Sequence, residues 1–184
     1  MPFTVLVTVG TTKFDALIDA VYSGSMLDVI STYESPRILI QHGASRISAD
    51  HAKHRGSIIG TDCFCSRIRG VDIYSFPYTS SFSALLTAAD VVIAHAGAGT
   101  ILEALRTETR PRLLAVPNNA LMDDHQRELA DALQGKYLCV GSTLYVCANR
   151  TLADDLQRTL AAEFLKFPPQ APYALADIVR GAWR

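Results

Sequence analysis

The feature that most constrains the fold is an alternation of short apolar runs with segments of helical periodicity. Residues 4–9 form an apolar run, a Gly-Thr-Thr triplet follows, and apolar side chains then recur at positions 14, 17, 18 and 21. That spacing places them on one face of a helix. Residues 91–94 read Val-Val-Ile-Ala, the continuous apolar pattern of a strand buried in a parallel sheet. The alternation predicts parallel strands joined by helices.

Extended along the chain, the same pattern indicates one α/β domain over residues 1–164. We predict strands at 4–9, 37–41, 72–76, 90–94, 112–116 and 137–140, and helices at 14–21, 80–89, 100–107 and 123–134, with residues 151–164 closing the regular part. Such an order implies right-handed crossovers and a Rossmann-like three-layer sandwich around a mostly parallel sheet. Residues 42–70 show little periodicity and are predicted to be an irregular excursion. Residues 165–184 contain three prolines and then a candidate docking helix.

Charge and hydropathy disfavour two classes of partner. The chain has 17 basic and 18 acidic residues and a formal net charge of -1, so it lacks the cationic field that nucleic acid requires. Its longest apolar stretches are far shorter than the ~20 residues that span a bilayer. The N-terminus has neither the basic region nor the cleavage site of a signal peptide. We expect a cytoplasmic protein with no nucleic-acid partner.

A glycine-rich segment, His-Ala-Gly-Ala-Gly-Thr at 95–100, lies between a predicted buried strand and a predicted helix. Glycines there would let backbone N–H groups approach an anion at the positive end of the helix. A tight turn without a ligand would have the same spacing. Leu102 stands where a dinucleotide fingerprint needs its third glycine, and no Gly-Lys-Ser/Thr of a P-loop is present. The motif thus disfavours both of those nucleotide-binding classes.

Three neighbouring segments are predicted to reach the same edge of the sheet. Glu103 follows Gly99 by four residues, and its carboxylate could accept hydrogen bonds from a ribose diol, although an exposed glutamate in a first turn would look the same. His125 and Gln126 open the next predicted helix, where a solvated first turn is again the alternative. The Gly-Thr-Thr triplet at 10–12 follows the first strand. Together these loops favour a site for a diphosphate, a ribose and a sugar.

Three segments carry a resemblance to a known family. They are Val-Thr-Val-Gly-Thr-Thr-Lys-Phe-Asp-Ala-Leu-Ile at 7–18, the segment 90–103 that contains the glycine motif, and Leu-Met-Asp-Asp-His-Gln-Arg-Glu-Leu-Ala at 121–130. In order and spacing they resemble the catalytic subunit of the dolichyl-diphosphate-linked N-acetylglucosaminyltransferase. A more distant similarity is to the C-terminal half of the bacterial lipid II N-acetylglucosaminyltransferase. Residues 42–70 and the tail fall outside the resemblance.

The resemblance implies the donor-binding half of a GT-B glycosyltransferase. UDP-GlcNAc would be the donor, dolichyl-diphospho-GlcNAc the acceptor, and a membrane-anchored partner subunit at the cytosolic face of the endoplasmic reticulum would bind that acceptor. No metal or other cofactor is implied, and the general base is expected on the partner, so no catalytic residue is assigned here. The implied substrate-binding residues are Gly10, Thr11, Thr12, His95, Gly97, Ala98, Gly99, Thr100, Glu103, His125 and Gln126.

Two other hypotheses remain open from the sequence. His51, His54, Cys63 and Cys65 could supply zinc ligands in a non-catalytic α/β nucleotide- or metal-binding interaction module, although their spacing matches no common zinc motif. A stand-alone transferase that uses another sugar nucleotide is the second, because these loops recognise UDP more plainly than GlcNAc. Binding of UDP-GlcNAc with little turnover by the isolated chain would separate the subunit hypothesis from both.

Overall fold

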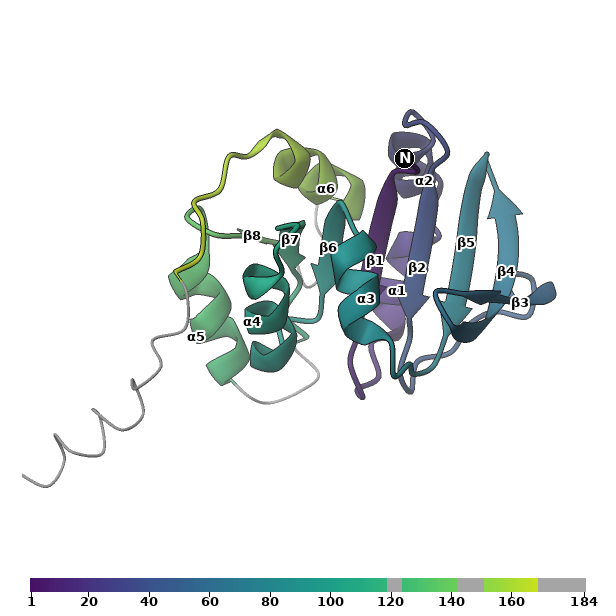
Figure 1. Ribbon diagram of the computed structural model, residues 1–184, viewed down its shortest axis with the longest axis horizontal. Helices are drawn as coiled ribbons and strands as arrows, with labels where there is room; N and C mark the ends of the chain where they lie inside the picture. Colours follow the sequence, from purple (N-terminus) through teal and green to yellow (C-terminus); the bar gives the residue numbers. More distant parts are fainter. Residues whose placement is uncertain (119–123, 142–150, 169–184) are drawn as a thin grey trace, which may run out of the picture.

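The computed structural model describes residues 1–118, 124–141 and 151–168, with the backbone alone described for 124–128 (Figure 1). Its centre is an eight-stranded sheet in the order β3-β4-β5-β2-β1-β6-β7-β8. The strands are β1 Thr4–Thr8, β2 Arg37–Gln41, β3 His54–Ile58, β4 Thr61–Ile68, β5 Val71–Phe76, β6 Val91–Ala94, β7 Arg112–Ala115 and β8 Cys139–Val140. From β5 to β8 every neighbouring pair is parallel. The predicted mostly parallel α/β sandwich is confirmed.

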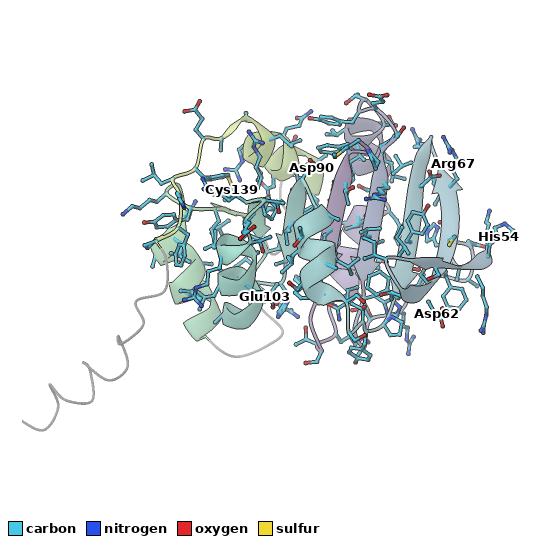
Figure 2. The ribbon with its side chains drawn as sticks, in the orientation of Figure 1. His54, Asp62, Arg67, Asp90, Glu103 and Cys139 are labelled. Carbon is cyan, nitrogen blue, oxygen red and sulfur yellow. The ribbon has the colours of Figure 1, made fainter. Side chains whose placement is uncertain are left out.

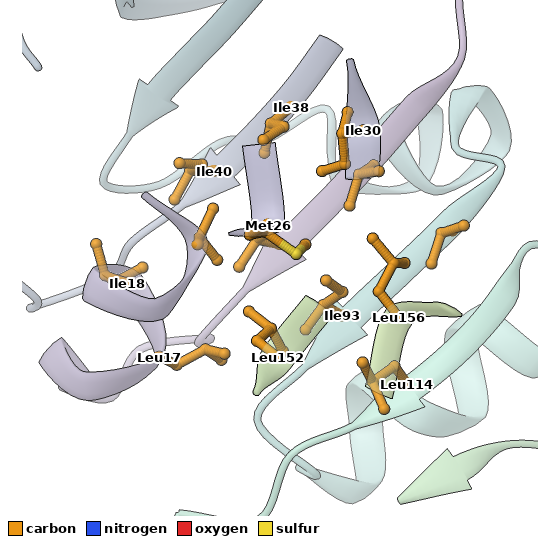
Figure 3. Packing of buried hydrophobic residues seen from close by; sticks show 14 of the residues in the cluster. Leu17, Ile18, Met26, Ile30, Ile38, Ile40, Ile93, Leu114, Leu152 and Leu156 are labelled. Carbon is orange, nitrogen blue, oxygen red and sulfur yellow. The ribbon is translucent and has the colours of Figure 1, made fainter. Parts of the chain in front are cut away.

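Within the described residues, six helices cover the two faces of the sheet. They are α1 Asp15–Val21, α2 Gly24–Ile30, α3 Phe82–Ala88, α4 Ala98–Arg106, α5 Asp124–Leu133 and α6 Leu152–Ala161. Buried side chains of α1, α2 and α6 pack with Val5 and Val7 on one face, as Figure 3 shows for part of that cluster. Buried side chains of α3, α4 and α5 pack with Leu6 on the other. Successive side chains of a strand point to opposite faces, so β1 contributes to both cores.

The region 42–70 differs from the predicted irregular excursion. Residues 54–76 form an antiparallel meander of β3, β4 and β5 that adds two strands to the parallel sheet. Each connection is a two-residue turn with both φ values positive, at Ile59-Gly60 (50° and 72°) and Arg69-Gly70 (50° and 82°). Such turns match the twist of a hairpin. The strands were missed because β3 and β4 are partly exposed and carry many polar residues, so they lack an apolar run.

The sequence prediction also lacked one helix, and part of the predicted tail lies outside the described residues. Helix α2 was not predicted, although Ser23 caps its first turn by accepting a hydrogen bond from the Met26 N–H at 3.4 Å. The tail is described only as far as residue 168. Within it, the Leu165 N–H donates to the Lys136 carbonyl at 2.9 Å. The candidate docking helix within 173–183 lies outside the described residues. No helix of the described part is long and apolar enough to cross a membrane.

Candidate functional site

Most of the predicted site residues meet at the carboxyl edge of the parallel sheet, where β1 and β6 end side by side. Thr8 is the register partner of Ala94. The ladder continues one residue further, because the His95 N–H donates to the Thr8 carbonyl at 3.1 Å. The two chains then diverge into the loop that contains Gly10 and the loop that contains Gly97. Open α/β sheets bind their ligands at this edge.

The imidazole of His95 lies between these two loops. A Cβ atom added at Gly10 would lie 2.8 Å from Cε1 of the ring, and one added at Gly97 would be even closer to Nε2. Contacts of that length are not tolerated, so both positions need glycine for steric reasons. Gly10 also has a φ of +63°, in the left-handed region that glycine adopts readily. His95 therefore sets the separation between the two loops.

The ring of His95 is buried, with 7% of the residue exposed. Burial lowers its pKa, while an interaction of Nδ1 with the Thr8 carbonyl at 3.4 Å acts in the opposite direction. The neutral ring with a proton on Nδ1 fits this contact, because a carbonyl accepts and cannot donate. The structure thus places His95 beneath the glycine loop, between its backbone and that of the β1 loop. Its contact with a ligand stays a prediction.

Helix α4 begins earlier than predicted, at Ala98, with Gly97 as its N-cap residue. The predicted loop residues Ala98, Gly99 and Thr100 accordingly form the first turn of the helix, where backbone N–H groups have no acceptor within the helix. No side chain caps this end. Ala98 and Gly99 are exposed, and a Cβ added at Gly99 would meet no atom within 4 Å. An anion could approach these amides closely.

Glu103 lies in the second turn of α4, on the same helix face as Gly99 (Figure 2). Its side chain is exposed, and it makes no ion pair within the described part of the chain. Its carboxylate is therefore open to a ligand. A surface glutamate without a role in binding would be exposed in the same way. The ribose contact stays a prediction.

The loop after β1 holds the other predicted phosphate contacts. Thr12 closes the turn, with its N–H and its hydroxyl both donating to the Val9 carbonyl, at 3.3 and 2.7 Å. Thr11 is exposed at its tip. The loop after β2 packs against it so closely that a Cβ added at Gly43 would lie 2.5 Å from the Gly10 carbonyl oxygen. The β1 loop is thus held on two sides, by His95 and by Gly43.

Gln41, which was not predicted, holds two loops in place. Its Nε2 donates to the carbonyls of Gly10 at 2.7 Å and Pro77 at 3.1 Å, and its Oε1 accepts from the Thr8 hydroxyl. The residue is buried, with 6% exposed. The only sequence signal is its place: a polar side chain that ends the apolar run 38–40 at the carboxyl edge of the sheet. We interpret Gln41 as the residue that fixes the loops after β1 and β5.

Two further polar side chains link this edge of the sheet. The Ser45 hydroxyl accepts from the Phe14 N–H at 2.7 Å, and the Asn118 amide donates to the Lys13 carbonyl at 3.1 Å. The loops after β2 and β7 are thereby both tied to the start of α1. These contacts join residues far apart in the sequence, so spacing gave no indication of them.

His125 and Gln126 fall in the first turn of α5, as predicted. Their side chains lie outside the described residues, and their predicted role remains an expectation.

The four candidate zinc ligands do not gather into one site. The ring of His51 stacks on Tyr22, with centroids 3.9 Å apart, whereas His54 lies opposite Cys65 in the β3–β4 hairpin. The Sγ atoms of Cys63 and Cys65 are 3.7 Å apart. Burial, followed by the influence of Cys65, raises the pKa of Cys63 to about 12, which favours the protonated thiol. Among the described residues, no three His, Cys, Asp or Glu side chains are grouped as a metal site needs.

A groove of ≈ 410 Å³ lies away from this edge, at the opposite end of the sheet, between the start of β7 and residues 162–167. It touches none of the loops described above. It lies where residues 162–167 pack against the start of β7.

Comparisons with known proteins show the family of this chain. Residues 4–165 match the glycosyltransferase family 28 C-terminal domain. A UDP-N-acetylglucosamine transferase subunit ALG13 of Cryptococcus neoformans is 38% identical over 156 residues, which cover 77% of this chain and 78% of the relative.

Two solved structures share the fold. A solution structure of ALG13 superimposes with a TM-score of 0.65 at 21% identity, covering 96% of this chain and 94% of that one. The crystal structure of MurG from Acinetobacter baumannii gives a TM-score of 0.56 at 19% identity, covering 88% of this chain and 42% of MurG. This chain therefore corresponds to one part of the longer MurG chain.

Proposed function

Since the chain belongs to the glycosyltransferase family 28 C-terminal domain family and to its group of UDP-N-acetylglucosamine transferase subunits, we propose that it binds UDP-GlcNAc as the donor subunit of a glycosyltransferase. The observation that carries this proposal is the packing of His95 between Gly10 and Gly97. It holds the first turn of α4 and the Gly-Thr-Thr loop beside one another, at the edge of the sheet where nucleotides bind.

In this proposal the diphosphate lies against the first turn of α4. The amides of Ala98, Gly99 and Thr100 and the positive end of the helix dipole would stabilise the negative charge, with the Thr11 hydroxyl on the other side. The Thr12 hydroxyl would donate to the diphosphate only by giving up its bond to the Val9 carbonyl. Glu103 would accept hydrogen bonds from the ribose hydroxyls, and His125 and Gln126 would contact the diphosphate-sugar region. These roles follow from the family and fit the exposed first turn of α4.

The reaction would be a displacement at the anomeric carbon of GlcNAc. An acceptor hydroxyl oxygen forms the new bond to this carbon, the bond from the carbon to the UDP oxygen breaks, and configuration inverts. The proton of the acceptor hydroxyl passes to a general base, which we place on the partner subunit. Amides and the dipole of α4 would stabilise the departing UDP, so this arrangement gives a divalent cation no required role.

We further propose dolichyl-diphospho-GlcNAc as the acceptor and a membrane-anchored subunit at the cytosolic face of the endoplasmic reticulum as the partner. The product would be dolichyl-diphospho-chitobiose, an early intermediate of N-glycan assembly. Support comes from the family, whose members are named as subunits, and from the fold, which covers 42% of the MurG chain. This chain would be cytoplasmic and would reach the membrane through its partner.

Calorimetric titration combined with an activity assay tests the proposal. The purified chain should bind UDP and UDP-GlcNAc saturably and transfer little GlcNAc to the lipid acceptor, and membranes that contain the partner should restore transfer. Robust transfer by the purified chain alone would contradict the division between two subunits. Failure to bind UDP in any form would contradict the donor site itself.

A further inference from the structure

A second groove, of ≈ 380 Å³, lies on the β3–β4 hairpin and the end of β5. Figure 2 labels Asp62 on this hairpin, far along the sheet from Glu103. Its lining residues come entirely from strands and from the residue after β5: Arg55, Gly56, Asp62, Cys63, Phe64, Ser75 and Pro77. The region is the one whose role the sequence left open, and nothing in the donor site uses it.

The strand register explains the chemistry of this groove. Arg55 pairs with Phe64, and Phe64 pairs with Ser75, so the three side chains form a row on one face of the sheet. The row continues inward to Ile40 and Val7, which are buried beneath the first two helices. No helical residue lines the groove. The same row of positions is therefore apolar under the helices and polar beyond them.

The groove offers an aromatic ring with hydrogen-bonding groups around it. Phe64 is half-buried, and the guanidinium carbon of Arg55 lies 5.7 Å from its ring centroid. Asp62 lies two residues earlier on the same strand and is exposed. The positive charge of Arg55 and the negative charge of Asp62 offset each other, so the groove favours neither an anion nor a cation. An aromatic surface with a few convergent polar groups is the usual lining of a site for a small polar molecule.

Ser75, at the floor of the groove, is 1% exposed. Its Oγ makes no hydrogen bond of normal geometry to any group in the described part of the chain. Buried hydroxyls without a partner are rare, because the desolvation cost is not recovered. Three more such atoms occur in the described residues: the Tyr22 hydroxyl, Nδ1 of His51 and the Ser66 hydroxyl. Ser66 lies on the same sheet face as Ser75, and the ring of His51 stacks on Tyr22.

Tyr22 connects these atoms to the groove floor. Burial raises the pKa of Tyr22 to about 12, and the nearby Ser75 hydroxyl acts in the opposite direction. The hydroxyls of Tyr22 and Ser75 are therefore near each other, and with the stacked ring of His51 and with Ser66 they form a buried polar cluster behind the groove. Hydroxyl and imidazole groups can both donate and accept, as the hydroxyls of a sugar do.

One amide joins the groove to the donor loops. The carbonyl of Pro77, which lines the groove, accepts from Gln41 Nε2 and from the Gly43 N–H, both at 3.1 Å. The same nitrogen of Gln41 donates to the Gly10 carbonyl. Because β5 is separated from β1 by β2 alone, the end of β5 is about 10 Å from the end of β1, two inter-strand spacings. That distance is comparable to the span of two sugar rings.

We propose that this groove binds a pyranose ring, with the C–H face of the sugar on Phe64 and its hydroxyls on Asp62 and Arg55. The inference rests on the proposed function, because the sugar is taken to be a substrate of the glycosyl transfer. The ring is either that of the acceptor or the sugar of the nucleotide donor, and the chemistry of recognition is the same for both.

NMR titration of the full chain with the β1,4-linked disaccharide of GlcNAc tests the proposal. The amide signals of residues 62–64 and 75 should shift saturably. Phe64→Leu keeps an apolar side chain but removes the flat ring, and Asp62→Asn keeps the shape of an exposed side chain but removes its charge. Each should weaken disaccharide binding about tenfold, the equivalent of one lost contact of ~1.4 kcal/mol. Tyr78→Leu is the matched control, because Tyr78 is an exposed aromatic residue outside the groove.

The titration repeated with saturating UDP-GlcNAc decides the source of the sugar. Shifts that persist assign the groove to the acceptor side, and shifts that UDP-GlcNAc alone reproduces assign it to the donor sugar. Disaccharide shifts confined to the loops after β1 and β6, or equal losses in Phe64→Leu and Tyr78→Leu, would overturn the groove. Disaccharide binding in the groove without any UDP binding would instead overturn the proposed function and leave the groove standing.

Discussion

Two glycines of one motif face different surroundings at the level of single residues. A methyl group at Gly97 would collide with Nε2 of His95, whereas a methyl group at Gly99 would point into open space. We expect Gly97→Ala to lower the free energy of unfolding by about 1–3 kcal/mol, the usual cost of overpacking, and to weaken UDP binding with it. Urea denaturation and calorimetric titration would measure the two effects.

Gly99→Ala is the matched control for Gly97→Ala. Alanine is the better helix former by about 1 kcal/mol, so the variant should be at least as stable as the parent protein. UDP affinity should nevertheless decrease, because the added methyl group stands where the diphosphate would approach the amides of α4. Unchanged affinity in Gly99→Ala would place the diphosphate elsewhere. Full stability in Gly97→Ala would contradict the packing of His95.

His95 also makes a prediction about pH. Burial lowers its pKa below the ordinary 6.5, so near that pH the unfolded chain binds a proton that the folded chain does not. The free energy of unfolding is then fully retained above the ordinary pKa and decreases as the pH falls below it. Urea denaturation between about pH 8 and pH 5 should show this decrease.

Replacing each histidine shows which ring causes the pH dependence of stability. His42, whose pKa is lowered by burial against hydrogen bonds with Ser45 and Gly43, contributes in the same direction. His95→Gln and His42→Gln should each flatten the slope of stability against pH, whatever their effect on stability at neutral pH. A slope that survives both substitutions would show that neither ring is held neutral by the fold.

Substitution of Glu103 tests whether the ribose of the nucleotide lies against the second turn of α4. Glu103→Ala should weaken UDP binding by about 1–3 kcal/mol, the cost of leaving ribose hydroxyls without partners, and leave stability nearly unchanged because the side chain is exposed. Glu108→Ala, an exposed glutamate beyond the end of α4, is the control and should bind UDP normally. Equal affinity in both variants would make Glu103 a surface residue without a role in binding.

Between elements, the contacts of Gln41 decide how the loops are held. Removal of its side chain would leave the Gly10 carbonyl without a donor and the Thr8 hydroxyl without an acceptor, and it would remove one of the two donors to the Pro77 carbonyl. We expect Gln41→Ala to cost about 2–3 kcal/mol of stability and to speed amide hydrogen exchange in the loops after β1 and β5. The exposed Gln157 of α6 is the control, since Gln157→Ala should change neither quantity. Normal exchange in Gln41→Ala would show that the loops are fixed by other contacts.

A helix or strand was predictable where its own apolar residues are continuous or periodic. Strands β1, β2 and β6 and helix α1 have continuous or periodic apolar residues, and their predicted positions agree with the structure. Strands β3 and β4 do not, because their stability depends on pairing with β5 and on the two-residue turns at Ile59-Gly60 and Arg69-Gly70. A partly exposed hairpin has no strong hydrophobic period, and its turn glycines alone do not distinguish it from a loop.

Across the whole molecule, the described part separates the donor edge from the C-terminal segment. Residues 165–168 pack at the other end of the sheet, where the ring of Phe167 meets Tyr137 edge-on with centroids 5.1 Å apart. We expect a chain that ends at residue 168 to keep its UDP affinity and to lose association with membranes that contain the partner. Calorimetry and co-sedimentation would measure the two. Loss of both would make residues 169–184 part of the fold, and loss of neither would exclude them from docking.

The sequence by itself determined the α/β class, the place of the glycine motif after a buried strand, and the family. Local hydrophobic periodicity and motif spacing are sufficient for these, because they depend on neighbours along the chain. Only the tertiary structure decided that His95 fills the space between Gly10 and Gly97, that Gln41 joins the loops after β1 and β5, and that Arg55, Phe64 and Ser75 form one row. Each of these depends on which strands lie side by side. That order is set by packing and pairing across the whole sheet, and no short stretch of sequence encodes it.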